Sequence, residues 1–321
     1  MKTLKITLVC ALLALTSLNS AADEGIKAIL PDATILYSVK DTYQLYLDIY
    51  HPAPGSLTRI DGIQKPTILF MFGGGFMSGT RDETYYTHWF KDLTEQGYSV
   101  VSIDYRLGLR NMKNPGLNKA FISGLLNSID IAVEDLFCAT LWLKENGHKY
   151  GIDAYNMVIC GSSAGAISVM QAEWELCNRS GKSSILPEDF DYKGVASFSG
   201  AIFSTVGRLE YKREPCPTLM LHGTADKIVP YGQIALFNLR FMGSDVISRT
   251  FRKNGYSYRI FRYQGNSHEV AGSMPKNVPM LTSFIEENVM TNTRVISDSR
   301  LTDPRIPVKN WGKGNYKKLY K

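Results

Sequence analysis

Apolar residues in this chain gather in short runs that have the length of β-strands. From residue 67 onward the runs are nearly continuous rather than alternating, which is typical of strands covered on both faces. An alternating run at residues 45–50 predicts a half-buried strand near the start, with another strand before it at residues 34–39. The later strands are predicted at residues 67–72, 98–104, 157–160, 195–199, 218–222 and 258–263.

Segments with helical spacing separate these strands. In residues 84–96, apolar side chains recur at the spacing of one helix face, at Tyr86, Trp89, Phe90 and Leu93. The other predicted helices are residues 128–149, 164–176, 231–242 and 275–289. This alternation predicts a three-layer α/β fold with a mostly parallel central sheet and helices on both faces.

The start of the chain has the pattern of a secretory signal peptide. Two lysines precede about ten apolar residues, and small residues end at Ala22. About ten apolar residues are too short to span a bilayer, and no later stretch approaches the ~18 that a spanning helix needs. We therefore expect export to the periplasm or the extracellular space. Residues 1–22 would be removed, residues 23–293 would form one domain, and no segment would span a membrane.

The position of the charge matters more than its size. The 321 residues carry a net charge of +6, and residues 300–321 alone hold seven basic side chains and one acid. The rest of the chain is balanced, so the sequence does not favour a nucleic-acid partner. Residues 294–321 are interpreted as a basic C-terminal tail, either solvated or in contact with acidic glycans or the cell surface. With 44% hydrophobic and 21% charged residues, the composition excludes intrinsic disorder.

Four cysteines follow the signal peptide, and their pairing stays open. They are Cys138, Cys160, Cys177 and Cys216. Four cysteines permit three full pairings, and an exported protein can keep disulfides. No pair has the spacing of a CxxC motif, so no metal site is predicted.

The strongest chemical signal is the G-x-S-x-G motif Gly161-Ser162-Ser163-Ala164-Gly165. It follows a predicted strand and precedes a predicted helix, which is the context of a nucleophile elbow. Such a turn presents the serine hydroxyl at the sheet edge and directs a helix N-terminus toward any developing negative charge. The flanking glycines are expected to leave room for the neighbouring strands and the helix. We predict Ser163 as a nucleophile.

A serine nucleophile needs a base and an orienting acid, here in the chain order Ser, Asp, His. His268 follows the strand at residues 258–263 and is the predicted base, with His222 as its rival. Asp226 lies in a loop between nucleophile and base and is the predicted acid, with Asp245 as a weaker alternative. The acid would hold the imidazole tautomer and stabilise the imidazolium that forms.

Three glycines follow the strand at residues 67–72, where donors for an oxyanion are expected. Glycines let backbone amides approach a substrate carbonyl without a Cβ in the way. We predict the amides of Gly74, Gly75 and Ala164 as the oxyanion hole, with Gly73 as the alternative. No G-K-[ST] sequence follows, so a phosphate-binding P-loop is not supported.

Together these motifs resemble the α/β-hydrolase superfamily, and more closely its secreted carboxylesterases. The stretches that add to the resemblance are GGGF at residues 73–76, DYRLG at 104–108, LWLKEN at 141–146 and HGTADKIVP at 222–230. The resemblance covers about residues 35–290 and implies ester hydrolysis without a metal or organic cofactor. The signal peptide and compact form look similar to those of bacterial feruloyl and acetyl-xylan esterases. Phe72 stands where relatives like hormone-sensitive lipase carry histidine, so that subfamily is not implied.

We therefore expect a serine ester hydrolase that acts through an acyl-enzyme on small acyl, feruloyl or acetyl esters linked to carbohydrate. A secreted serine peptidase of the same fold, a lipase for short acyl chains and a non-catalytic binding protein remain alternatives. Phe76, Met77 and Tyr86 lie beside the glycine loop and are predicted to line the substrate site, or else to belong to the core. The sequence leaves the oligomeric state open.

Overall fold

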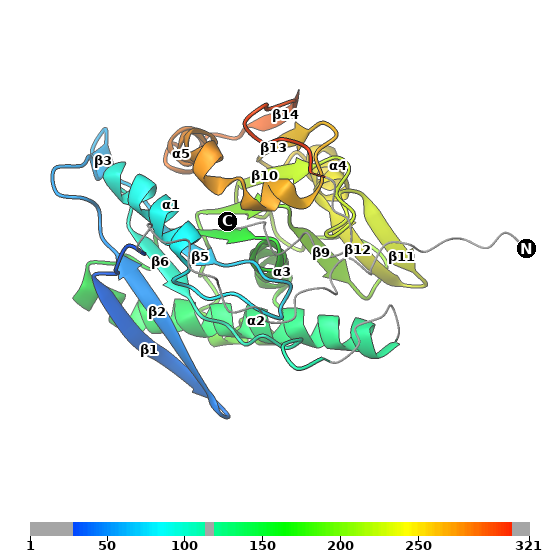
Figure 1. Cartoon of the computed structure of the whole chain (residues 1–321), viewed down its shortest axis with the longest axis horizontal. Helices are drawn as coiled ribbons and strands as arrows, with labels where there is room; N and C mark the ends of the chain where they lie inside the picture. Colours follow the sequence, from blue (N-terminus) through cyan, green and yellow to red (C-terminus); the bar gives the residue numbers. More distant parts are fainter. Residues whose placement is uncertain (1–27, 113–118, 310–321) are drawn as a thin grey trace, which may run out of the picture.

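A computed structural model describes residues 28–112 and 119–309, so the predicted signal peptide lies outside the described residues. Figure 1 shows a central sheet with helices on both sides. The strand order in this sheet is β1-β2-β6-β5-β7-β8-β10-β13-β14. The bounds are β1 Ala33–Lys40, β2 Tyr43–Tyr50, β5 Thr67–Met71, β6 Val100–Ile103, β7 Met157–Ser162, β8 Gly194–Phe198, β10 Thr218–Gly223, β13 Tyr258–Tyr263 and β14 Ile296–Leu301.

The sheet is mostly parallel, as the sequence predicts. Strand β2 pairs antiparallel with β1 and with β6. Every neighbouring pair from β6 to β14 is parallel. The eight strands predicted from the sequence are all present, with ends that agree to within about two residues. Strands β5, β7, β8 and β10 are buried throughout, which explains their continuous apolar runs.

Helices cover both faces of the sheet, with α1 and α5 on one side and α2 and α3 on the other (Figure 1). On the first side, the Phe70 ring of β5 packs against Tyr86, Trp89 and Phe90 of α1 at centroid distances of 4.9, 5.2 and 5.4 Å. On the other side, α2 packs on α3, which lies against β7 and β8. The bounds are α1 Thr84–Glu95, α2 Lys119–Asn146, α3 Ala164–Asn178, α4 Ser244–Asn254 and α5 Val278–Phe284.

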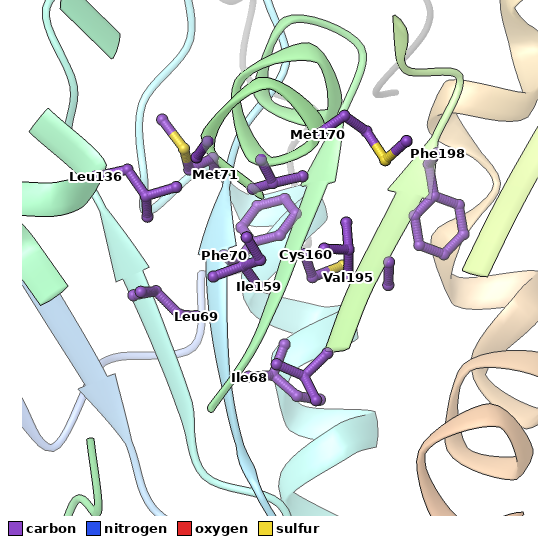
Figure 2. Packing of buried hydrophobic residues seen from close by; sticks show 14 of the residues in the cluster. Ile68, Leu69, Phe70, Met71, Leu136, Ile159, Cys160, Met170, Val195 and Phe198 are labelled. Carbon is purple, nitrogen blue, oxygen red and sulfur yellow. The ribbon is translucent and has the colours of Figure 1, made fainter. Parts of the chain in front are cut away.

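The core lies between the central strands and these helices. Figure 2 shows Ile159 and Cys160 of β7, Leu136 of α2 and Met170 of α3 among the packed side chains around the central strands. All four side chains are buried, and burial raises the pKa of the Cys160 thiol well above its ordinary range. The four cysteines that the structure describes are free thiols. Among the described residues, no helix combines the length and the apolar character that crossing a bilayer requires.

The prediction of a helix at residues 231–242 is wrong. The structure has a β-hairpin there, formed by β11 Gln233–Leu236 and β12 Leu239–Gly243. The chain reverses at Phe237, where φ is +52°. Strand β12 pairs with β9 Ala201–Ser204, so a partner strand from a distant part of the chain overrides the local helical spacing.

The predicted last helix, at residues 275–289, is divided in the structure. Pro279 interrupts it, because proline lacks the amide hydrogen that a helix interior needs. The segment consists of the 3₁₀ helix Met274–Asn277, then α5, then a π-helical turn at Ile285–Val289. The remaining short elements are β3 Arg59–Ile60, β4 Ile63–Gln64 and the 3₁₀ helices Gly147–Tyr150, Gly181–Ile185 and His268–Gly272.

The expected boundary between domain and tail at residue 293 also differs from the structure. Strand β14 extends the central sheet in parallel with β13. Arg262 of β13, which is buried, holds Asp298 of β14 through an Nε–Oδ1 contact of 2.6 Å. Beyond β14, Ile306 is buried and its carbonyl accepts a hydrogen bond of 2.9 Å from Asn266. The tail is therefore part of the folded domain as far as the described residues extend.

Candidate active site

Ser163 lies on a sharp turn between β7 and α3, with φ +52° and ψ −114°. Two glycines make this turn possible. A Cβ on Gly161 would lie 2.4 Å from the backbone of Gly165, and a Cβ on Gly165 would lie 2.1 Å from the carbonyl oxygen of Met71. The predicted role of the flanking glycines is thereby confirmed. The turn has the strand-to-helix geometry of a nucleophile elbow.

Ser163, His268 and Asp226 form a continuous hydrogen-bonded chain. Ser163 Oγ lies 2.8 Å from His268 Nε2, and His268 Nδ1 lies 2.7 Å from Asp226 Oδ2. A carboxylate can only accept, so Nδ1 carries a hydrogen and Nε2 of the neutral ring accepts the serine hydroxyl. All three side chains are buried, with exposed fractions of 7%, 3% and 5%. Their positions are those that proton transfer from a serine hydroxyl requires.

The Asp226 carboxylate is anchored by its own loop. Its Oδ1 accepts the amides of Ile228 at 2.9 Å and Val229 at 3.2 Å. Burial by itself raises the pKa of this carboxyl. The positive charge of His268 in its protonated form and hydrogen bonds from two histidines outweigh burial and hold the pKa well below its usual range. Asp226 is therefore ionised and ready to balance positive charge on an imidazole.

The acid loop and the histidine loop are joined through their backbones. The amide of Ala225 donates to the carbonyl of Asn266 at 2.8 Å, and the amide of Thr224 donates to the carbonyl of Tyr263 at 2.9 Å. Gly223 is required at this crossing, because a Cβ there would lie 2.2 Å from the carbonyl of Ser267. These contacts hold Asp226 and His268 at a fixed separation.

The histidine loop is also joined to the elbow. Ser162, the residue before the candidate nucleophile, donates its hydroxyl to the carbonyl of Ala271 at 2.7 Å. The histidine loop is also bonded to α1, where Tyr85 donates its hydroxyl to the carbonyl of Gly272. The three loops that carry the chain of hydrogen bonds therefore form one cross-linked unit at the carboxyl ends of β7, β10 and β13.

The glycine loop after β5 is tightly folded. Gly74 has φ +131°, and a Cβ there would lie 1.9 Å from the carbonyl of Ser78. The Gly73 amide donates to the Tyr86 hydroxyl at 3.0 Å, so this amide is already engaged. Of the predicted donors in this loop, Gly74 and Gly75 remain candidates, and the Gly73 alternative is disfavoured.

The residues predicted to line the substrate site lie in the core. Phe76, Met77 and Tyr86 have exposed fractions of 0%, 8% and 1%. This burial argues against contact between a substrate and Phe76 or Tyr86. Tyr86 instead holds the Gly73 amide, and Tyr105 donates its hydroxyl to the carbonyl of Phe72 at 2.8 Å. The sequence did not predict that Tyr86 and Tyr105 support the glycine loop, because the position of a tyrosine in an apolar run does not indicate which group its hydroxyl will bond.

The two rival residues have other partners. Asp245 lies at the start of α4, where its carboxylate pairs with Arg262 and Arg249 at 2.8 Å each. Asp245 is therefore held in a separate ion pair. His222 bonds Ser244 Oγ at 2.8 Å and the carbonyl of Val229 at 3.2 Å. Its Nε2 also lies 3.4 Å from Asp226 Oδ2. Within residues 28–112 and 119–309, no cluster of three or more His, Cys, Asp or Glu side chains is arranged to hold a metal ion.

A separate groove of about 840 Å³ lies at the opposite edge of the sheet. Its lining includes residues just before the strands, such as Asn156, Lys193, Pro217 and Ser257. None of the three hydrogen-bonded residues lines this groove, so it is not part of the candidate active site.

Sequence comparison relates the first half of the chain to esterases. Residues 37–175 match the model of the carboxylesterase family, a range that includes Ser163 and the glycine loop. Fumonisin B1 esterase of Sphingopyxis macrogoltabida is 29% identical over 123 residues, which are 38% of this chain and 21% of that protein. Cholinesterase 2 of Branchiostoma lanceolatum is 36% identical over 103 residues, 32% of this chain and 28% of that protein. The match thus spans about a fifth to a quarter of these relatives' lengths.

Solved structures match over most of the chain. A thermophilic esterase of Thermogutta terrifontis with bound butyrate aligns over 81% of this chain and 96% of its own, with a TM-score of 0.56 and 19% identity. At this level of identity the match concerns the fold alone. The chain has the α/β-hydrolase fold, and residues 37–175 within it are similar in sequence to the carboxylesterases.

Proposed function

We propose that the protein is a serine carboxylic-ester hydrolase with Ser163 as nucleophile, His268 as base and Asp226 as orienting acid. The observation that carries this proposal is the chain of contacts at 2.8 and 2.7 Å from Ser163 Oγ through His268 to Asp226. The match of residues 37–175 to the carboxylesterase family supports the choice of esters among the acyl compounds that such a site can attack.

The reaction follows from this geometry. His268 Nε2 takes the hydroxyl proton as Ser163 Oγ attacks the ester carbonyl. The same proton then passes to the leaving alcohol, and an acyl-serine remains. Water repeats the two steps, giving its proton to His268 and its hydroxyl to the acyl carbon, so the acid is released and Ser163 is regenerated.

The oxyanion in each step is stabilised by the amides of Ala164, Gly74 and Gly75. Ala164 begins α3, so its amide belongs to the orphan donors at the positive end of the helix. The bonds that Met77 and Ser78 donate to the carbonyl of Gly74 fix the glycine loop. Each donor of this kind is worth about 3 kcal/mol in the transition state.

The proposed substrates are small acyl esters, among them acetyl and feruloyl esters of carbohydrates. The butyrate bound to the Thermogutta esterase supports a small acyl group, and the names of the two relatives support an ester as substrate. Carbohydrate linkage is supported by the resemblance to bacterial feruloyl and acetyl-xylan esterases. The signal-peptide pattern supports export, so polymers outside the cytoplasm would be accessible to the enzyme.

A substrate series tests this proposal. Nitrophenyl esters of increasing acyl length, methyl ferulate and acetylated xylan are compared with an aminoacyl nitroanilide, and a fluorophosphonate probe is mapped by mass spectrometry. We expect hydrolysis of short acyl, feruloyl or acetyl esters and labelling at Ser163. A strong preference for long acyl chains would replace the carbohydrate-esterase proposal with a lipase, and cleavage of the nitroanilide alone would indicate a peptidase.

A further inference from the structure

A second histidine lies beside the candidate acid. His222, in β10, is completely buried, and its Nε2 lies 3.4 Å from Asp226 Oδ2. The same carboxylate oxygen is 2.7 Å from Nδ1 of His268. The proton transfers of the proposed reaction do not use His222. A buried imidazole in contact with the acid therefore needs an explanation of its own.

The contacts of His222 fix where its hydrogen lies. Its Nε2 is 3.2 Å from the carbonyl oxygen of Val229 as well as 3.4 Å from Asp226. Both of these partners can only accept, so Nε2 must carry a hydrogen, which the two oxygens share. On the other side of the ring, Nδ1 lies 2.8 Å from Ser244 Oγ, and the serine hydroxyl can donate to it. The Nε2–H tautomer of the neutral ring thus satisfies all three contacts.

The contact of 3.4 Å between Nε2 and Asp226 Oδ2 constrains the orientation of the acid. A carboxylate can turn about its Cβ–Cγ bond, and each orientation directs Oδ2 to a different place. The amides of Ile228 and Val229 hold Oδ1 on one side. A donor on Oδ2 from His222 fixes the other side, so the remaining lone pair of Oδ2 is directed at His268 Nδ1.

The anchorage of the His222 ring makes it suited to this role. After Asp226 the chain leaves the site as the hairpin β11–β12 and returns at Ser244, where α4 begins. The ring bonds Val229 on the outgoing segment and Ser244 on the returning one. Tyr231 packs edge-on against it at a centroid distance of 5.6 Å. The ring therefore links the two ends of this segment, at Val229 and Ser244, to β10 beside Asp226.

We propose that His222 is a positioning residue that holds Asp226 in the orientation needed to bind His268, an inference that rests on the proposed function. His222 acts through the acid and contacts neither Ser163 nor the reacting ester. Its loss would leave substrate binding intact and weaken the step in which His268 gains a proton. The expected signature is a fall in kcat with little change in KM.

Two substitutions at His222 separate the hydrogen bond from packing. His222→Leu removes the donor, whereas His222→Gln keeps an N–H near the position of Nε2. Met220→Ala, in the same strand and equally buried, is the control for lost stability without contact to Asp226. Kinetics on nitrophenyl acetate are measured for each variant, with circular dichroism to verify folding.

We expect His222→Leu to lower kcat roughly 10- to 100-fold, as for the loss of a hydrogen bond to a charged group. His222→Gln should recover most of this loss, and Met220→Ala should be less stable but keep the wild-type kcat. A folded His222→Leu with wild-type kcat would overturn the inference, and so would a Gln variant as slow as the Leu variant.

A spectroscopic measurement tests the inference without a variant and without activity. The ¹⁵N shifts of the His222 ring in the wild-type protein report which nitrogen is protonated. A protonated Nε2 supports the inference, and a bare Nε2 overturns it. A wild-type protein that neither hydrolyses esters nor takes up the fluorophosphonate at Ser163 would instead contradict the proposed function, so the two failures are distinguishable.

Discussion

The start of α3 passes so close behind β5 that a Cβ on Gly165 would lie 2.1 Å from the carbonyl oxygen of Met71. The obstacle is backbone at the centre of the sheet, and it cannot move aside without disturbing β5. The elbow that carries Ser163 and the strand that leads into the glycine loop are therefore fitted to each other. Glycine at position 165 sets the distance between the nucleophile and the candidate oxyanion donors.

Gly165→Ala should therefore destabilise the protein by about 2–3 kcal/mol and lower esterase activity more than stability alone explains. The reason is that α3 must move away from β5 and shift the elbow. Chemical denaturation and kcat at a temperature where the variant is folded measure the two effects. Gly232→Ala is the matched control, because a Cβ at that position would have no atom within 4 Å beyond those of its chain neighbours. Equal changes in stability and kcat for the two substitutions would contradict the close contact between α3 and β5.

Tyr86→Phe should slow ester hydrolysis although the ring stays in the core. Without the hydroxyl, the Gly73 amide loses the acceptor that it has at 3.0 Å, and the glycine loop loses an anchor. An unsatisfied buried amide costs about 1–3 kcal/mol. Tyr98→Phe removes a hydroxyl that bonds Glu286 at 2.9 Å, away from the site, and should cost stability without changing kcat. If both variants keep the wild-type kcat, the bond between Tyr86 and the Gly73 amide does not support the oxyanion donors.

Glu173→Gln should raise the melting temperature progressively as pH increases. Burial raises the pKa of Glu173, although the Cys216 amide and the Cys177 thiol both donate to Oε1. Its Oε2 is buried without a hydrogen-bond partner. Because the folded-state pKa is raised, the stability that the protonated group contributes is present below about pH 4.3 and is lost as pH rises through the raised value. Thermal melts at a series of pH values should show that the melting temperature of the variant exceeds that of the wild type by more as pH rises. A difference in melting temperature that stays constant with pH would contradict this prediction.

Asp298→Ala should destabilise the protein by about 2 kcal/mol, because it takes a carboxylate partner from the buried Arg262 and removes the link between β13 and β14. Arg252→Ala breaks a second ion pair of Asp298, but the Arg252 side chain is 58% exposed. That substitution should cost no more than about 1 kcal/mol. The free energy of unfolding in urea measures both, and a larger effect for Arg252→Ala would mean that β14 is held by other contacts.

The central strands and the elbow were predictable because their physical causes are local. Strands covered on both faces need continuous apolar runs, and β5, β7 and β10 are such runs. The elbow needs glycines at fixed positions around Ser163, and both are present. The order of nucleophile, acid and base along the chain then left few choices for the other two positions.

The parts that the sequence did not reveal depend on distant partners. The hairpin of β11 and β12 forms because β9 is available to pair with β12, and β14 is half exposed and polar, so no apolar run marks it. Helix α4 was missed although its signals are present. Asp245 lies in its first turn, and Gly255 ends it in the left-handed conformation with φ +70°.

The most direct test of the central claim is the rate of nitrophenyl acetate hydrolysis by the wild-type protein and by Ser163→Ala under identical conditions. Ser163→Ala removes one oxygen atom and should leave the fold unchanged by circular dichroism and melting temperature. The account predicts measurable hydrolysis by the wild type and a loss of at least about 10⁴-fold in the variant. A well-folded Ser163→Ala that hydrolyses the ester at the wild-type rate would contradict the assignment of Ser163 as the nucleophile.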